Sequence, residues 1–193
     1  MKFNLRHVIA FLLLIALSIG FGFGFDAIAH SIEKSNHPRP DSISSAVSQN
    51  AKEFGIPEAV IFATVKNGSN FASNAVSASG KIGLMQLSPE QLSFVCREVL
   101  KTEQKDAGLL YEPETNLYVG CAYLSYLYGR YGIWEHVFSA YHTDIETVDE
   151  WLQNDDYLSA QGVLIHIPNA ATASYVQTLT KSAESYGKLY YQA

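Results

Sequence analysis

Residues 69–87 read SNFASNAVSASGKIGLMQL and form the most informative stretch of the chain. Up to Gly83 the stretch is rich in Ser, Asn, Ala and Gly, which predicts a structured loop rather than a helix or a strand. It ends in an apolar run that contains one polar residue, Gln86. A Gln in such a run needs a hydrogen-bond partner, which is either another part of the protein or a ligand. Its neighbour Met85 is predicted to be a core residue, because thioethers commonly fill gaps in cores.

Hydrophobic spacing on both sides of this loop predicts an all-α fold. The first helix is expected to end at Gly55 and the second at Asn67-Gly68, since Gly commonly follows a helix C-terminus and both residues are poor helix formers. Ser88-Pro89-Glu90-Gln91 predicts a capped helix start. No strand-like alternation is present, so at most one very small β-hairpin is expected. Apolar residues recur at helical spacing in residues 43–54, 58–66, 92–100, 117–131, 135–141, 146–152 and 175–190.

The N-terminus has the features of an export signal. Lys2 and Arg6 precede an apolar run from Val8 to Phe25, which is longer than a usual signal-peptide core and just long enough to span a bilayer. The positive flank predicts that the rest of the chain lies outside the cytoplasm. An uncleaved anchor is favoured, but Ala27-Ile28-Ala29 offers a cleavage site for a secreted form. The expected organisation is a signal peptide or signal-anchor helix in residues 1–29, a polar tether in 30–41 and one domain in 42–193.

The composition excludes several classes of function. The net charge is −6 and the Lys and Arg residues are scattered, whereas nucleic-acid binding needs a basic stripe. The six His residues show no metal-ligand spacing, and neither a metal nor a cofactor is expected. Cys96 and Cys121 are too few for a disulfide scaffold. They are predicted to be buried free thiols, with a single disulfide bridge as the alternative.

Three later stretches, together with the loop of residues 69–87, resemble the soluble lytic transglycosylase (SLT) domain family. The resemblance covers about residues 42–190, in the order in which the family carries its motifs. It implies an all-α, lysozyme-like fold of the goose-type-lysozyme and SLT architecture. The three later stretches are Glu112-Pro113-Glu114-Thr115-Asn116-Leu117 with Gly120, Ala140-Tyr141 with Trp151-Leu152, and Ile167-Pro168 with Tyr175-Val176.

The resemblance also implies a function in the cell envelope. Enzymes of this family cleave the MurNAc–GlcNAc bond in the glycan strands of peptidoglycan and form 1,6-anhydro products. The implied partners are therefore glycan strands, with an envelope protein as a further partner and the membrane reached through the N-terminal segment. The residues implied to line the glycan groove are Ser77, Gly83, Gln86, Tyr141 and Tyr175, although Gly83 has tight packing as its alternative role.

One position departs from the family at the point of its chemistry. The resemblance implies a single Glu directly before Ser69-Asn70-Phe71, which protonates the glycosidic oxygen and then accepts a proton from the sugar's own hydroxyl. Gly68 stands at that position and cannot transfer a proton. Loss of a positioned general acid typically costs about 10²–10⁴ in rate.

Two further departures are also at polar positions. His142-Thr143-Asp144 stand where the family has Asn-Ala-Gly, and Ala171-Thr172-Ala173 stand where it has Glu-Thr-Arg. The apolar framework is retained. We therefore predict a pseudoenzyme that binds glycan strands or an envelope partner.

Two alternatives stay open. Asp144 and Glu146 are carboxylates in the loop expected to face the missing acid, and either would serve as a displaced acid in an active transglycosylase. Acidic residues are also common at a helix start, where they interact well with the helix dipole, and that role is favoured. In the other alternative, the chain is a structural envelope domain whose groove is closed by His142 and Asp144.

Overall fold

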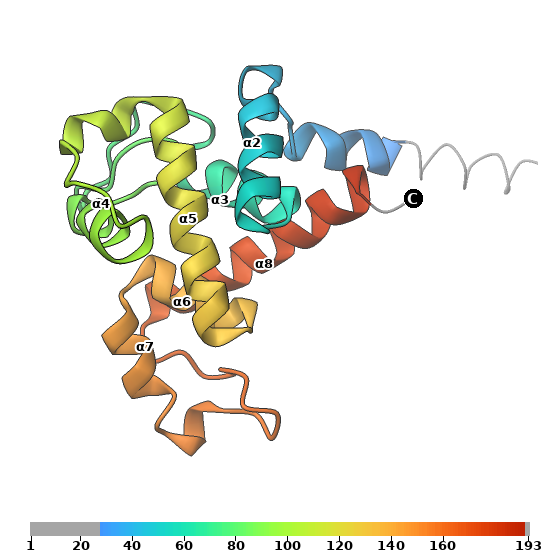
Figure 1. Cartoon of the computed structure of the whole chain (residues 1–193). Helices are drawn as coiled ribbons and strands as arrows, with labels where there is room; N and C mark the ends of the chain where they lie inside the picture. The colour runs from blue at the N-terminus through green and yellow to red at the C-terminus, as the bar shows by residue number, and fades with distance from the viewer. Residues whose placement is uncertain (1–27, 192–193) are drawn as a thin grey trace, which may run out of the picture. The chain divides into compact units, whose positions relative to one another are not determined.

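The computed structural model describes residues 28–191 (Figure 1). The chain divides into two compact units, residues 1–38 and 39–193. In the first unit, residues 28–36 are helical, which the sequence did not predict, so the expected tether begins as a helix. The expected signal or anchor run Val8–Phe25 lies outside the described residues. Within residues 28–191, no helix combines the length and the apolar character needed to cross a membrane.

The second unit is built from helices, as predicted. Residues 28–191 contain no sheet, and the hairpin that the sequence allowed for is reduced to isolated bridges such as Val76 with Ile82. Short 3₁₀ and π-helical turns join the longer elements at Val95–Val99, Ala107–Tyr111 and Asp155–Tyr157. The α-helices are α2 (Asp41–Phe54), α3 (Glu58–Ser69), α4 (Pro89–Phe94), α5 (Pro113–Tyr131), α6 (Trp134–His142), α7 (Ile145–Trp151) and α8 (Ala170–Tyr190).

The predicted start of α4 is confirmed at atomic detail. The Gln91 backbone N–H donates to the Ser88 hydroxyl at 3.2 Å, and the Ser88 N–H donates to the Gln91 side-chain oxygen at 2.9 Å. This reciprocal pair satisfies two backbone donors that a helix start otherwise leaves free. The predicted stop at Gly55 is confirmed too, because Gly55 adopts a φ of 67° after the last residue of α2.

The predicted end of α3 at Asn67-Gly68 is wrong. The helix continues through Gly68 to Ser69, and Asn70 caps it in the left-handed conformation with a φ of 48°. Asn tolerates that conformation better than most residues, because its short polar side chain forms local hydrogen bonds. The Ser69 hydroxyl lies within hydrogen-bond distance of Val65 O (3.2 Å) and Leu84 O (2.9 Å) and holds the last turn in place. Gly68 is therefore a helical residue and does not terminate the helix.

The core is arranged around α3 and α5. Every residue from Ala59 to Val65 is buried, so α3 is enclosed on all sides over two turns. The last helix, α8, packs along α3 and α6, while α5 packs against α2 and α6 (Figure 1). The rings of Phe62 and Tyr186 stack at 5.7 Å between centroids and join α3 to α8. The predicted core residue Met85 is 1 % exposed. Cys96 and Cys121 are buried and free, so the alternative of a disulfide between them is not realised.

Close packing of Met85 on Gly120 generates a first prediction. A Cβ added at Gly120 would lie 2.3 Å from the sulfur of Met85, whereas a Cβ at Gly129 on the same helix would meet nothing within 4 Å. We expect Gly120→Ala to lower the free energy of unfolding by about 1–3 kcal/mol through overpacking. The control Gly129→Ala should raise it by up to about 1 kcal/mol, as a helical Gly→Ala change normally does. Urea unfolding measures both, and a Gly120→Ala variant at least as stable as the parent would contradict the packing described.

Candidate functional site

The turn formed by residues 83–86 is held in place by the buried side chain of Asn116, which lies in the first turn of α5. The Asn116 amide nitrogen donates to Ile82 O at 2.9 Å and to Leu110 O at 2.8 Å. The Asn116 amide oxygen accepts from the backbone N–H of Met85 at 2.7 Å. The backbone N–H of Met85 would otherwise be buried without a partner, at a typical cost of about 1–3 kcal/mol. Asn116 thereby fixes the turn that carries Gln86.

Gly83, predicted to line the groove, has the packing role that was its alternative. Its φ is +78°, which favours glycine. A Cβ at this position would lie 2.2 Å from the amide nitrogen of Asn116 and 2.3 Å from Leu110 O. Gly83 is buried and lets the turn approach Asn116, and it is not among the residues that line the cleft described below.

Gln86 satisfies its amide within the protein. The residue adopts a φ of +52°, and its side-chain nitrogen donates to Gly83 O at 2.8 Å and to Ala75 O at 3.2 Å. The hydrogen-bond partners expected for Gln86 are therefore backbone oxygens of its own loop. The side chain remains half-buried at the surface of a cleft.

This cleft is a cavity of about 380 Å³. It brings together four of the five residues predicted to contact glycan, and Gly68 lies among them. The lining comes from α3, the loop of residues 77–86, α6 and α8. The residues that line it are Asn67, Gly68, Ser77, Ser79, Lys81, Met85, Gln86, Tyr141, His142 and Tyr175.

Position 68 faces the cleft. A Cβ built on Gly68 would lie 3.2 Å from Cγ of Gln86 and 3.5 Å from Leu84 O. A side chain at this position would therefore extend beside Gln86. The ten residues of the cleft include no carboxylate.

Tyr141 and Ser77 contribute walls to the cleft, and their hydroxyls are engaged within the protein. The Tyr141 hydroxyl donates to Met85 O at 2.9 Å, and burial raises the pKa of Tyr141 well above its usual value. The Ser77 hydroxyl accepts from the backbone N–H of Lys81 at 3.0 Å and closes the turn of residues 77–81. Both side chains shape the cavity from fixed positions.

His142 and Tyr175 form one side of the cleft as a pair. Their rings stack with centroids 4.5 Å apart and planes 27° apart. The Nδ1 atom of His142 lies 3.0 Å from the Thr172 hydroxyl, so the end of α6 contacts the start of α8. Burial lowers the pKa of His142, and the positive charge of Lys81 lowers it further.

Lys81 is a cleft residue that the sequence analysis missed. Its ammonium donates to His142 O at 2.9 Å and to Tyr141 O at 3.4 Å, at the C-terminal end of α6. Burial lowers the pKa of Lys81. One signal was available in the sequence, because Lys81 is the only charged residue between Lys66 and Glu90.

Asp144 and Glu146, considered as displaced acids, line a different cavity of about 230 Å³ that shares Lys81 with the cleft. Asp144 is the N-cap of α7. One of its carboxylate oxygens accepts from the Thr147 N–H at 2.7 Å, and the other accepts from the Thr147 hydroxyl at 2.9 Å. The two carboxylates contribute to raising the pKa of nearby Tyr123 to about 12, although burial is the larger cause. Neither lines the cavity beside Gly68.

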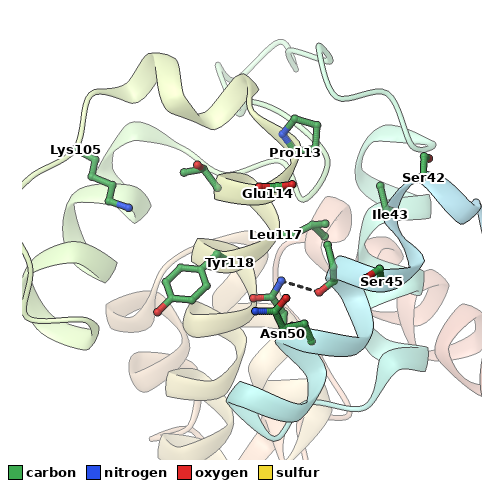
Figure 2. Close-up of a pocket in the computed structure, with 12 residues that line it drawn as sticks. Ser42, Ile43, Ser45, Asn50, Lys105, Pro113, Glu114, Leu117 and Tyr118 are labelled. Atoms are coloured by element: carbon green, nitrogen blue, oxygen red, sulfur yellow. Dashed lines mark hydrogen bonds between the residues drawn. The ribbon is translucent and has the colours of Figure 1, made fainter.

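A further cavity of about 470 Å³ lies between α2 and the start of α5. Figure 2 shows Ser42, Ile43 and Ser45 on the α2 side and Pro113 and Glu114 on the α5 side. None of the residues predicted to contact glycan lines it. It is therefore distinct from the cleft that contains Gly68.

These features define an all-α, lysozyme-like domain with a cleft beside a turn that a buried Asn holds in place. Residues 45–163 match the transglycosylase SLT domain family. The chain therefore belongs to this family. The match covers three of the four ordered motifs in the sequence, and the last one, Ile167-Pro168 with Tyr175-Val176, follows it.

Relatives with known names are lytic murein transglycosylases. The chain is 29 % identical over 127 residues to the soluble lytic murein transglycosylase of Escherichia coli K12, covering 64 % of this chain and 20 % of that protein. It is 35 % identical over 89 residues to the membrane-bound lytic murein transglycosylase C of Yersinia enterocolitica, covering 44 % of this chain and 24 % of that protein. The chain thus spans only about a fifth to a quarter of the length of these relatives.

Solved structures share the fold. The lytic transglycosylase Slt of Pseudomonas aeruginosa, studied as an inactive Glu→Gln mutant, is 29 % identical and superposes with a TM-score of 0.68, covering 77 % of this chain and 24 % of that one. The 70 kDa soluble lytic transglycosylase of Escherichia coli superposes with a TM-score of 0.72 at 23 % identity, covering 81 % of this chain and 25 % of that one.

The buried histidines generate a second prediction, on pH. Burial lowers the pKa of His142 and also of His136, whose Nε2 accepts from the Leu164 N–H at 3.1 Å. The unfolded chain, with His pKa values near 6.5, therefore binds more protons than the fold as the pH falls. Stability is full above about pH 6.5 and decreases toward pH 5, by at most about 1.4 kcal/mol per histidine per pH unit.

Urea unfolding between pH 7.5 and 5 measures this dependence. The variant His142→Asn should show a smaller decrease in the free energy of unfolding than the parent protein. The control His30→Asn, in the helix of residues 28–36, should retain the parent's decrease. An unchanged pH dependence in His142→Asn would contradict the burial of a neutral imidazole against Tyr175.

Proposed function

We propose that this chain is a non-catalytic SLT domain protein of the cell envelope, which binds peptidoglycan glycan strands in the cleft beside Gly68. One observation carries the proposal: the ten residues that line the cleft include no carboxylate, and position 68 is a glycine on α3. A transglycosylase needs a general acid within hydrogen-bond reach of the glycosidic oxygen, directly or through one water. The inactivity of the Glu→Gln mutant of the Pseudomonas aeruginosa enzyme supports the need for a Glu in this family.

The volume of the cleft favours a binding role rather than the alternative of a closed groove. Ligand pockets typically enclose about 300–1,000 Å³, and the cleft retains about 380 Å³ with His142 in place. His142 stacks on Tyr175 along one side and leaves this volume free. Asp144 lines a separate cavity and does not fill the cleft. Glycan strands are favoured over an envelope protein as the occupant because the lining is a recessed cavity with several hydroxyl and amide groups.

The hydrogen bonds of Asp144 argue against a displaced acid. Both oxygens of the Asp144 carboxylate accept hydrogen bonds from Thr147, and the residue lines the neighbouring cavity rather than the cleft beside Gly68. Glu146 is exposed at the start of α7 and does not line the cleft. We therefore assign no catalytic residue to this chain.

An envelope location follows from the N-terminal run Val8–Phe25 and from the relatives, whose names include a membrane-bound lytic murein transglycosylase. The proposed arrangement is a domain outside the cytoplasm, either anchored by this run or released after cleavage at Ala27–Ala29. This arrangement would expose the cleft to peptidoglycan.

A third prediction concerns activity on purified cell wall. The parent chain should release no 1,6-anhydro-muropeptides above a blank without protein, and it should still sediment with the insoluble cell wall. Liquid chromatography with mass spectrometry detects the anhydro products. Anhydro-muropeptides above the blank would contradict the pseudoenzyme proposal, and their loss in Asp144→Asn would then identify the displaced acid.

A fourth prediction restores the acid. The nearest atom to a Cβ at position 68 is Cγ of Gln86 at 3.2 Å, so this Cβ is accommodated when Gln86 shifts by a few tenths of an ångström. We expect Gly68→Glu to release anhydro products at least about 100-fold above the parent, since a positioned general acid contributes about 10²–10⁴ in rate. The matched control Gly68→Gln should stay inactive. A Gly68→Glu variant that neither releases products nor sediments with cell wall would favour the structural role with a closed groove.

A further inference from the structure

We infer that the cleft selects glycan segments that carry a carboxylate, and that Lys81 is the residue that binds this carboxylate. The inference rests on the proposed function, because it names the class of glycan that the same cleft takes. In this inference Lys81 determines which glycan binds, and it takes no part in catalysis. The argument comes from the bonding of the ammonium, from the charges around it and from the chemistry of the strand.

The ammonium of Lys81 has one hydrogen-bond donor left for a ligand. An ammonium carries three N–H donors. Two of them are directed to the carbonyl oxygens of His142 (2.9 Å) and Tyr141 (3.4 Å). Lys81 forms no ion pair among residues 28–191, where the ion pairs involve other side chains. Because two carbonyl oxygens hold the ammonium at the end of α6, it is fixed at the wall of the cleft.

A half-buried charge without a counter-charge is unfavourable, and a ligand of opposite charge relieves that cost. The lining of the cleft supplies no carboxylate to do so. His142, the other ionisable base at the wall, is held toward its neutral form by burial and by Lys81 itself. The cleft therefore presents one fixed positive charge among neutral hydroxyl and amide groups.

Acidic residues do lie near Lys81, on its other side. Glu90, Asp144 and Glu146 line the neighbouring cavity that Lys81 shares. Asp144 accepts two hydrogen bonds from Thr147. None of the three carboxylates forms an ion pair with Lys81. None of them occupies the donor of Lys81 toward the cleft. They also repel an anionic ligand from the neighbouring cavity, so the cleft beside Gly68 is the favoured side.

Peptidoglycan offers the matching group. Its strands alternate a neutral N-acetylated amino sugar with one that bears a lactyl group, and this lactyl group ends in a carboxylate or in an amide-linked peptide with carboxylates of its own. Chitin-type strands consist of the neutral sugar alone. A cleft that uses Lys81 as an anchor must therefore bind carboxylated strands more tightly than neutral strands of equal length.

Calorimetric titration of the full-length chain with three tetrasaccharides tests the inference. The probes are neutral chitotetraose, the peptide-free peptidoglycan tetrasaccharide with free lactyl carboxylates, and the same tetrasaccharide bearing its peptides. We expect a carboxylated probe to bind at least about tenfold more tightly than chitotetraose, as for a desolvated charge-assisted hydrogen bond. Tight binding of the peptide-free probe supports the lactyl carboxylate as the source, and tight binding of the peptide-bearing probe alone supports the peptide.

The variant Lys81→Met separates specificity from structure. It should weaken binding of the carboxylated probe by about tenfold and change the affinity for chitotetraose by less than about twofold. The variant Lys81→Arg should retain most of the discrimination. The matched control Lys52→Met, at an exposed lysine of α2, should leave all three affinities unchanged.

Salt provides a test that needs no variant. Raising the salt concentration from about 0.05 to 0.5 M should weaken the binding of the carboxylated probe and leave that of chitotetraose unchanged, because salt screens an accessible ion pair. Equal affinity for neutral and carboxylated probes would overturn the inference and leave glycan binding intact. An equal loss for all probes in Lys81→Met would also overturn it, since Lys81 would then act only as a structural tie. Failure of every probe to bind would instead overturn the proposed function.

Discussion

The contact between Asn116 and the turn of residues 82–86 is the constraint on which the site depends. One buried amide satisfies three backbone groups of the turn and of the segment before α5. Gly83 is needed because any side chain there would collide with this amide. The same turn positions Met85 against Gly120 and offers Met85 O to the Tyr141 hydroxyl. These five motif positions thus have packing roles that do not involve a substrate.

This dependence supports the proposal that the fold does not require a carboxylate at position 68. Asn116, Gly83, Gly120 and Tyr141 stabilise the domain through one another, and none of them requires a carboxylate at position 68. A glycine there leaves α3 helical and its contacts with the turn intact, since Ser69 supplies the bond to Leu84 O. These packing roles agree with the proposal of a domain that keeps the fold and a cavity of about 380 Å³ without a general acid at position 68.

Local patterns in the sequence predicted most of the fold, and the errors arose at contacts between distant residues. The Ser88 capping box and the stop at Gly55 depend on residues within a few positions of one another, so both were predictable. The end of α3 depends on a hydrogen bond from Ser69 to Leu84, fifteen positions away, and the sequence alone gave no sign of it. Lys81 is held in the site by hydrogen bonds to the backbone of Tyr141 and His142, about sixty positions away. Gly83 was assigned to the groove by resemblance, and only the position of Asn116 reveals its packing role.

The most direct measurement is a crystal structure of the chain soaked with a peptidoglycan tetrasaccharide, with mass spectrometry of the ligand recovered from the same crystals. The account predicts an intact tetrasaccharide in the cleft beside Gly68, between Gln86 and the stacked pair of His142 and Tyr175. A tetrasaccharide bound only in the cavity between α2 and α5 would contradict it. Recovery of a shortened 1,6-anhydro product would contradict it as well, because the cleft would then contain an acid that its ten lining residues do not supply.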